Sequence, residues 1–233
     1  MLALALCATS HAQTAEEATA SDPVVTGSFW SNWYLQAGLD MTLLNPYGCD
    51  FSKVFPNGKM FGLNVAAGKN FTPEVGLRVR LKWGNGFPLF KNDHLTWLGP
   101  NNYPGENMDK GGYMAIYGDV QVNLVNLIKG YDAERRWSVI VFPRAGFISN
   151  LAIKSSSPLV GVGVGGTYKI NKRLGLYADI AYQVTTSEFI DISESTTGMG
   201  VSTGSNGHID IQIGVQWDLG KSAGKFKRLS EYK

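Results

Sequence analysis

The segment EVGLRVRLKW at residues 74–83 decides the fold, because its side chains alternate between apolar types and charged or small types. Successive side chains of a β-strand point to opposite faces, so this alternation predicts a strand with one apolar and one charged face. An α-helix would scatter the same charges around its surface. The apolar set is Val75, Leu77, Val79, Leu81 and Trp83, and the opposite set is Gly76, Arg78, Arg80 and Lys82.

The segment HIDIQIGVQWDL at 208–219 repeats the pattern, with Ile, Val, Trp and Leu alternating against Asp, Gln and Gly. Two such runs are hard to obtain by chance, and other segments show the same period of two. The sequence therefore predicts strands at about 33–41, 60–71, 74–83, 113–124, 136–147, 159–169, 174–185 and 208–219.

The period of two also indicates how the strands are arranged. No apolar run reaches the roughly 18 residues that a membrane-spanning helix requires, which leaves a closed barrel as the way to satisfy the backbone in lipid. We therefore predict an all-β fold, an eight-stranded antiparallel up-and-down transmembrane β-barrel. A soluble β-sandwich is the alternative, but it would not need charged inward faces. Gly161, Gly163 and Gly165 are expected to face inward, making room for large neighbours such as Tyr34, Tyr117 or Tyr177.

The beginning of the sequence, MLALALCATSHAQ, is typical of an export signal. Ser10 and Ala12 fit a cleavage site before Gln13, so Cys49 is the one cysteine expected after cleavage, and no intrachain disulfide can form. No role is assigned to this thiol. The expected organisation is a signal peptide at 1–12, a flexible periplasmic leader at 13–30, the barrel at 31–219 and a basic, solvated periplasmic tail at 220–233.

Connection lengths predict the orientation. Short to moderate connections are expected at about 70–73, 126–135 and 170–173, and longer ones at about 44–58, 85–112, 148–158 and 186–206. Periplasmic turns of outer-membrane barrels are short and outer loops are long, so both termini are expected in the periplasm. Lipid-facing aromatic residues are expected to form two girdles: Trp33, Phe71, Trp137, Tyr168 and Trp217 at the periplasmic end, and Phe61, Trp83 and Phe147 at the outer end.

The last predicted strand also carries a family resemblance. In QIGVQWDL (212–219), Gln212, Gly214, Trp217 and Leu219 fit the pattern that marks outer-membrane barrels for insertion. Together with the segments at 64–86 and 157–183, the chain resembles the barrel domain of OmpA-like outer-membrane proteins, of the forms found in Bacteroides-type bacteria. The resemblance covers roughly residues 30–220 and includes no peptidoglycan-binding domain.

The resemblance implies a location in the outer membrane of a Gram-negative bacterium. Outer-membrane lipid and the barrel-insertion machinery are then the expected partners. A cell-wall tethering role is in doubt, because the peptidoglycan-binding domain is not part of the match.

The interior of an eight-stranded barrel is just wide enough to be filled by side chains. Charges that face it must pair or keep water, because an uncompensated buried charge costs several kcal/mol. We interpret them as a plug of salt bridges centred on Arg78 and Arg80, with a gated ion path as the alternative. The predicted lumen charge network is Arg78, Arg80, Lys82, Arg144, Asp40, Asp119, Asp179, Asp210 and Asp218.

Other chemistry finds little support in the sequence. The formal net charge of +2 is close to balance and does not suggest that the protein binds nucleic acid. After the signal peptide only His94 and His208 remain, and although Ser205 and Asp210 are near His208, nothing fixes a nucleophile against a base. No spaced ligand set for a metal is present. We expect no enzyme activity, cofactor or metal site.

Three functions therefore stay open at this level: a structural barrel of the outer membrane, a narrow or gated porin-like channel, and a surface receptor or adhesin that binds a ligand through its outer loops. The loop candidates are Phe90, His94, Trp97 and Tyr103. The oligomeric state does not follow from the sequence.

Overall fold

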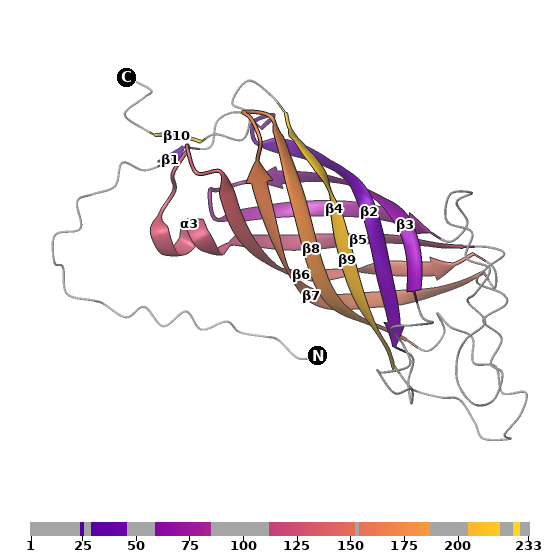
Figure 1. Ribbon diagram of the computed structural model, residues 1–233. Coiled ribbons are helices and arrows are strands. Elements are labelled where there is room, and N and C mark those ends of the chain that lie inside the picture. Colours follow the sequence, from indigo (N-terminus) through magenta and orange to yellow (C-terminus); the bar gives the residue numbers. More distant parts are fainter. Residues whose placement is uncertain are drawn as a thin grey trace, which may run out of the picture.

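The computed structural model describes residues 24–25, 29–45, 59–84, 112–151, 154–186, 205–219 and 226–228. Within them, eight strands pair antiparallel in sequence order, and the last closes on the first to make a barrel (Figure 1). The predicted fold class is confirmed. The strands are β2 (Trp33–Asn45), β3 (Lys59–Asn70), β4 (Val75–Gly84), β5 (Tyr113–Asn123), β6 (Trp137–Asn150), β7 (Ser155–Lys169), β8 (Leu174–Thr186) and β9 (Ser205–Asp218).

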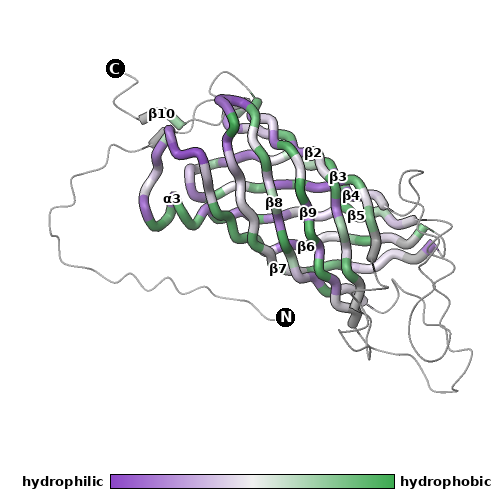
Figure 2. Tube along the Cα trace, viewed as in Figure 1, coloured by the Kyte–Doolittle hydropathy of each residue, from purple (hydrophilic) through white to green (hydrophobic). Residues whose placement is uncertain are grey.

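The barrel is polar inside and apolar outside. Along β4 exposed and buried residues alternate without a break, and Val79 is 54% exposed while Arg80 is fully buried. Figure 2 shows the same alternation of hydrophobic and hydrophilic residues along the strands. A soluble protein buries its apolar residues and exposes its charges, so this barrel has the reverse arrangement.

Short connections join the strands at one end of the barrel, which we call the turn end. The turn at 170–173 is held by Asn171, whose Oδ1 accepts hydrogen bonds from the backbone N–H groups of Arg173 (2.9 Å) and Leu174 (2.8 Å). At 71–74, the Thr72 hydroxyl accepts from the backbone N–H of Val75 at 3.0 Å. Asn and Thr side chains stabilise turns in this way because they replace backbone partners.

The third connection at the turn end contains a short helix, α3 (Leu124–Lys129), that the sequence analysis did not predict. Asn123 caps it, since its Oδ1 accepts from the backbone N–H of Asn126 at 3.1 Å. Arg135 then donates to the Asn126 side chain (2.9 Å) and to the Gly130 carbonyl (3.0 Å), which folds the rest of the connection back onto the helix. Within the described residues, no helix is both long and apolar enough to span a membrane.

One predicted long loop is wrong. The expected loop at 148–158 is a tight hairpin, because β6 and β7 stay paired up to Asn150 and Ser155. Two serines of the segment lie opposite each other on the paired strands, with the hydroxyls of Ser149 and Ser156 2.8 Å apart. The central parts of the other long connections, at 46–58, 85–111 and 187–204, lie outside the described residues, as do the predicted signal peptide and Cys49. We call the end of the barrel where β6 is joined to β7 the far end, since it lies opposite the turn end.

The leader and the tail also depart from the expectation of a flexible leader and a solvated tail. The strands β1 (Val24–Val25) and β10 (Lys227–Arg228) pair antiparallel at the turn end. Phe226 is buried, its ring packs edge-on against Tyr131 at 5.7 Å, and its backbone N–H donates to the Tyr131 hydroxyl at 2.9 Å. A residue that the sequence placed in a polar tail is thus anchored by an aromatic partner about 95 positions away.

The inward glycines face other partners than expected. An added Cβ at Gly163 would meet the Phe142 ring at 2.5 Å, and one at Gly165 would meet the Asp179 carboxylate at 2.0 Å. The expected tyrosines lie against different glycines, so that part of the prediction is wrong. Tyr34 packs on Gly68, Tyr117 on Gly146, and Tyr177 on Gly38 and Gly214.

Candidate functional site

Among the residues that the structure describes, eight buried charged side chains form ion pairs in the lumen, each at most 6% exposed. Four are cations and four are anions, so their formal charges cancel. Because each comes from a strand position of inward parity, the alternation along the strands is what brings them together. They are Arg78, Arg80 and Lys82 on β4, Arg144 on β6, Asp40 on β2, Asp119 on β5, Asp179 on β8 and Asp210 on β9.

The half of the lumen nearer the turn end is organised around two carboxylates. Arg78 contacts Asp119 at 2.6 Å through Nη2 and at 2.8 Å through Nε, and its Nη1 lies 2.8 Å from Asp179. Arg80 reaches Asp179 through Nη2 at 3.0 Å. Gln36 accepts from both guanidinium groups, at 3.2 Å from Arg78 and 2.7 Å from Arg80. Arg78 and Arg80 thus share both a carboxylate and an amide.

The other half, toward the far end, is organised around one amine. The Lys82 Nζ lies 2.6 Å from Asp40 and 2.8 Å from Asp210, and it also donates to the Thr42 hydroxyl. Thr42 in turn donates to Asp210 at 2.7 Å, and the Tyr113 hydroxyl donates to Asp40 at 2.8 Å. All three hydrogens of the ammonium group therefore have acceptors, which a buried lysine requires.

Arg144 joins the two halves. Its Nε donates to Asp119 at 2.8 Å, while its Nη1 contacts Asp210 and Gln183, each at 3.4 Å. Since Asp119 also binds Arg78, and Asp210 also binds Lys82, the ion pairs form one connected network along the lumen.

Each of the four cations also lies over an aromatic ring. The guanidinium carbon of Arg144 is 3.9 Å from the Tyr117 ring centroid, and the other three distances are between 4.9 and 5.2 Å. Cations over aromatic faces gain electrostatic attraction when they are removed from water. The remaining pairs are Arg78 with Phe142, Arg80 with Tyr177, and Lys82 with Tyr113.

Several contacts cross the barrel from one wall to the opposite wall. The strands β4 and β8 lie four positions apart in the ring of eight, as do β5 and β9. Arg80 on β4 binds Asp179 on β8, and Gln212 on β9 donates to the Tyr117 hydroxyl on β5 at 2.7 Å. The side chains therefore fill the width of the lumen rather than only lining its wall.

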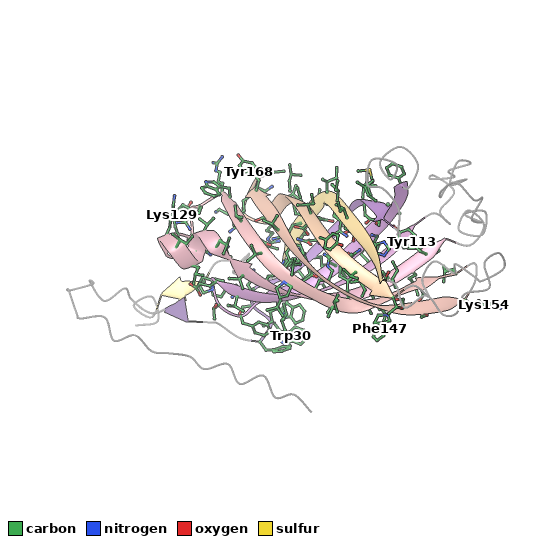
Figure 3. All side chains as sticks on the ribbon, turned by 90° about the horizontal axis from the view of Figure 1, so that it is seen from below. Trp30, Tyr113, Lys129, Phe147, Lys154 and Tyr168 are labelled. Atoms are coloured by element: carbon green, nitrogen blue, oxygen red, sulfur yellow. The ribbon has the colours of Figure 1, made fainter. Side chains whose placement is uncertain are left out.

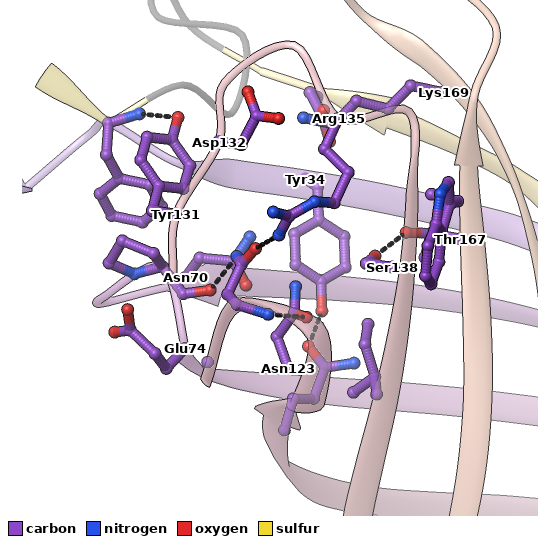
Figure 4. Close-up of a pocket in the computed structure, with 18 of the residues that line it drawn as sticks. Tyr34, Asn70, Glu74, Asn123, Tyr131, Asp132, Arg135, Ser138, Thr167 and Lys169 are labelled. Atoms are coloured by element: carbon purple, nitrogen blue, oxygen red, sulfur yellow. Dashed lines mark hydrogen bonds between the residues drawn. The ribbon is translucent and has the colours of Figure 1, made fainter. Parts of the chain in front are cut away.

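Asp218 is the one residue of the predicted network that lies elsewhere. Among the described residues no ion pair includes it, and its Oδ1 accepts from the Gln216 amide at 2.8 Å. It lines a cavity of about 90 Å³ at the turn end, between the barrel mouth, the connection after α3 and Phe226 (Figure 4). Tyr34 and Gln121 line the same cavity, and the Tyr34 hydroxyl donates to the Gln121 side chain.

Sequence reasoning missed the uncharged polar residues that complete the network. Gln36, Thr42 and Gln212 bind charged or phenolic groups there, and the Tyr177 hydroxyl donates to Asn64 at 2.7 Å. Their inward parity was visible in the alternation, but their partners were not. His208 is also inside the lumen, fully buried, and its Nε2 lies 2.7 Å from the Thr185 hydroxyl. The Ser205 side chain lies outside the described set, and within that set no cluster of His, Cys, Asp or Glu could hold a metal.

The predicted girdle residues lie at the two ends of the barrel exterior. Trp137 pairs with Tyr168, and Leu35 with Trp217, at the turn end, whereas Leu63 pairs with Trp83 toward the far end. Figure 3 shows Tyr168 near α3 and Phe147 projecting outward toward the other end. Most of these aromatic side chains are about half exposed, and only Trp33 and Phe61 of the set are less exposed. The set comprises Trp33, Phe71, Trp137, Tyr168 and Trp217 at the turn end, and Phe61, Trp83 and Phe147 toward the far end.

The residues of the predicted insertion pattern divide between the two faces of β9. Gln212 and Gly214 face the lumen, where Gly214 packs against Gly38 and the Tyr177 ring. Trp217 is on the exterior and half exposed, and Leu219 follows the end of the strand.

Comparisons with known proteins give similarities of fold. No protein-family model matches the chain, and no curated protein matches it. Among solved structures, Neisserial surface protein A is 14% identical, with a TM-score of 0.45 over 81% of this chain and 98% of that chain. Ail of Yersinia pestis is 10% identical, with a TM-score of 0.41 over 80% and 99%. The outer membrane protein OprG of Pseudomonas aeruginosa is 9% identical, with a TM-score of 0.42 over 79% and 94%.

Proposed function

We propose that this chain is a structural protein of the Gram-negative outer membrane, a barrel whose lumen is closed by its network of ion pairs and which carries out no catalysis. The observation that carries the proposal is the reversal of faces in the barrel. Half-exposed apolar side chains lie outside on all eight strands, and buried charges from six of the strands lie inside. In water such an exterior would expose far more contiguous apolar surface than a soluble monomer tolerates. In a bilayer the same surface is solvated by acyl chains.

The location and orientation rest on further features of the sequence. The stretches that resemble OmpA-like barrels of Bacteroides-type bacteria, and the insertion pattern ending at Leu219, support outer-membrane lipid and the insertion machinery as partners. The short turns at 71–74 and 170–173 support a periplasmic turn end, and with it periplasmic termini.

The network favours a plug over an open channel. Its charges cancel, the ion-pair distances run from 2.6 to 3.4 Å, and contacts such as that between Arg80 and Asp179 reach across the lumen. An ion that passed through would have to part these contacts and leave charges unpaired in a poorly hydrated interior, which costs several kcal/mol per group. A gated channel is the second candidate, because among the described residues the two halves of the network are joined by ion pairs of Arg144 alone.

Planar-bilayer recording tests this proposal on the purified, folded chain. We expect no steady conductance from the natural protein, and openings from a variant with both Arg78→Ala and Arg80→Ala. Folding is verified independently by heat-modifiable gel migration, folded against boiled. As a control, Lys154→Ala changes an exposed cation at the far end and should leave the bilayer silent. Steady conductance of the natural protein would favour the channel, and recovery as a water-soluble species would contradict the membrane location.

A further inference from the structure

The exterior of the barrel has a hollow where two small residues face lipid side by side. Gly166 on β7 and Ala178 on β8 are direct partners across the two strands. An added Cβ at Gly166 would find its nearest neighbour at 3.6 Å, so the glycine is not required by close packing. Larger side chains stand around the pair: Val164 and Ile180 on one side, Tyr168 and Leu176 on the other, with Val139 and Ile213 on the flanking strands.

The hollow is large enough to hold part of a ligand. Its volume is about 720 Å³, within the range of small-molecule sites, and almost all of its lining is apolar. Ala37 and Val215 border it and also border a second apolar hollow of about 460 Å³, whose lining comes from β2, β3 and β4 and from the ends of β8 and β9 near the turn end. Together the two hollows form a groove across neighbouring strands rather than an isolated dimple.

Cations stand at the turn end of this groove. Trp137 and Tyr168 line it there, and the Lys129 ammonium lies 5.9 Å from the centroid of the Trp137 ring. Figure 3 shows Lys129 and Tyr168 at the same end of the barrel. The turn that joins β7 to β8, the two strands carrying the hollow, adds the exposed Lys172 and Arg173. None of the ion pairs among the described residues uses these cations.

We propose that this groove binds one phospholipid of the leaflet at the turn end, with an acyl chain in the hollow over Gly166 and Ala178 and the phosphate between Lys129 and Lys172. The inference rests on the proposed membrane location. An apolar groove that ends in aromatic rings and then cations has the same order of chemistry as a phospholipid from tail to headgroup.

A second copy of the chain fits the groove less well. The outward positions of the described strands carry no Asp or Glu, so a barrel wall packed against the groove would offer no opposite charge to Lys129 or Lys172. A flexible acyl chain can also fill an irregular hollow, whereas two rigid sheet faces would leave voids, which lose packing contacts.

Native mass spectrometry of the folded protein in micelles that contain palmitoyl-oleoyl phosphatidylglycerol tests the site. The natural chain should retain one lipid when the micelle is stripped. Gly166→Leu fills the hollow and should lower the retained fraction about tenfold, the effect of about 1.4 kcal/mol. Gly118→Leu is the matched control, because Gly118 also faces outward with its nearest neighbour at 3.9 Å but lies away from the groove.

A second pair of variants tests the headgroup without filling the groove. Lys129→Gln with Lys172→Gln should weaken retention of phosphatidylglycerol, and Lys154→Gln at the far end should not. The proposal would be overturned if Gly166→Leu and Gly118→Leu retained the lipid equally, or if the Lys129→Gln/Lys172→Gln variant retained it as well as Lys154→Gln. A dimer of the natural chain that Gly166→Leu dissociates would also overturn it. A protein that folds and inserts into vesicles yet retains no lipid contradicts only this inference, whereas failure to insert contradicts the proposed function itself.

Discussion

At the scale of single residues, the lumen depends on shared partners. The Asp119 carboxylate accepts from Arg78, in the half nearer the turn end, and from Arg144, which joins that half to the other. Removing one partner of a buried ion pair is costly because it leaves the other charge uncompensated. A charged residue that binds two partners of the opposite sign should therefore be among the positions where substitution destabilises the barrel most.

The substitution Asp119→Asn tests this. It leaves two guanidinium groups without their common anion, and we expect a loss of about 3–5 kcal/mol in the free energy of unfolding. Guanidinium titration of the protein in phosphatidylcholine vesicles, followed by Trp fluorescence, measures it. Asp218→Asn is the control, because Asp218 is also inward and buried but binds only an amide, and it should cost less than about 1 kcal/mol. Equal losses would mean that the ion pairs do not stabilise the fold.

Glycines of the strands differ in how much room their surroundings leave for a side chain. An added Cβ at Gly68 would stand 2.2 Å from the Tyr34 ring, whereas one at Gly118 meets nothing closer than 3.9 Å. We expect Gly68→Ala to destabilise the barrel by about 1–3 kcal/mol through overpacking and Gly118→Ala to be tolerated. The destabilisation by Gly68→Ala should be smaller in a chain that already carries Tyr34→Leu. Thermal unfolding of the three single variants and of the Gly68→Ala/Tyr34→Leu double variant measures this. An equal destabilisation with and without Tyr34 would contradict the overpacking explanation.

At the scale of elements, the turn end is closed by segments from three parts of the chain. The connection after α3 supplies Tyr131, the tail supplies Phe226, and the leader supplies β1, which pairs with β10. None of these pieces is a barrel strand. Among the described residues, the contacts that hold them include an aromatic contact, a hydrogen bond to the phenol and a two-residue ladder.

The substitution Tyr131→Phe removes the phenolic acceptor and keeps the ring. We expect trypsin to cut the tail near Lys227 and Arg228 several times faster, since release of the backbone N–H of Phe226 frees the pairing next to it. Timed digestion with mass analysis of the fragments measures the rate. Leu127→Ala, on the exposed face of α3, is the control and should leave it unchanged. Cleavage as slow in Tyr131→Phe as in the natural chain would show that the hydrogen bond does not hold the tail.

At the scale of the whole molecule, the barrel separates two solvents. Val79 lies in the middle of β4 and is half exposed on the apolar exterior. Val79→Arg should disfavour membrane folding by about 2–4 kcal/mol, the cost of an arginine at the bilayer midplane, whereas Val79→Leu should fold as the natural chain does. The folded fraction in phospholipid vesicles, read from heat-modifiable gel migration, measures the difference. Efficient folding of Val79→Arg would argue against a lipid-facing exterior.

The sequence by itself determined the eight strands and which side chains face inward, because the period of two is a local property of an extended backbone. It therefore placed Arg78, Arg80 and Arg144 inside without knowledge of their partners. It failed at 148–158, where β6 and β7 continue into the segment expected to be a loop, and at α3, a short element that depends on a cap and on contacts from later residues.

Only the tertiary structure decided the partners. Lys82 and Asp210 are 128 positions apart, and they meet because β9 closes on β2 and brings the two sides of the lumen within reach. The same closure leaves Asp218 outside the network, near the mouth, and sets Gly166 beside Ala178 on the exterior. Parity along a strand assigns a face, but pairing across the barrel depends on register and closure, which no single strand contains.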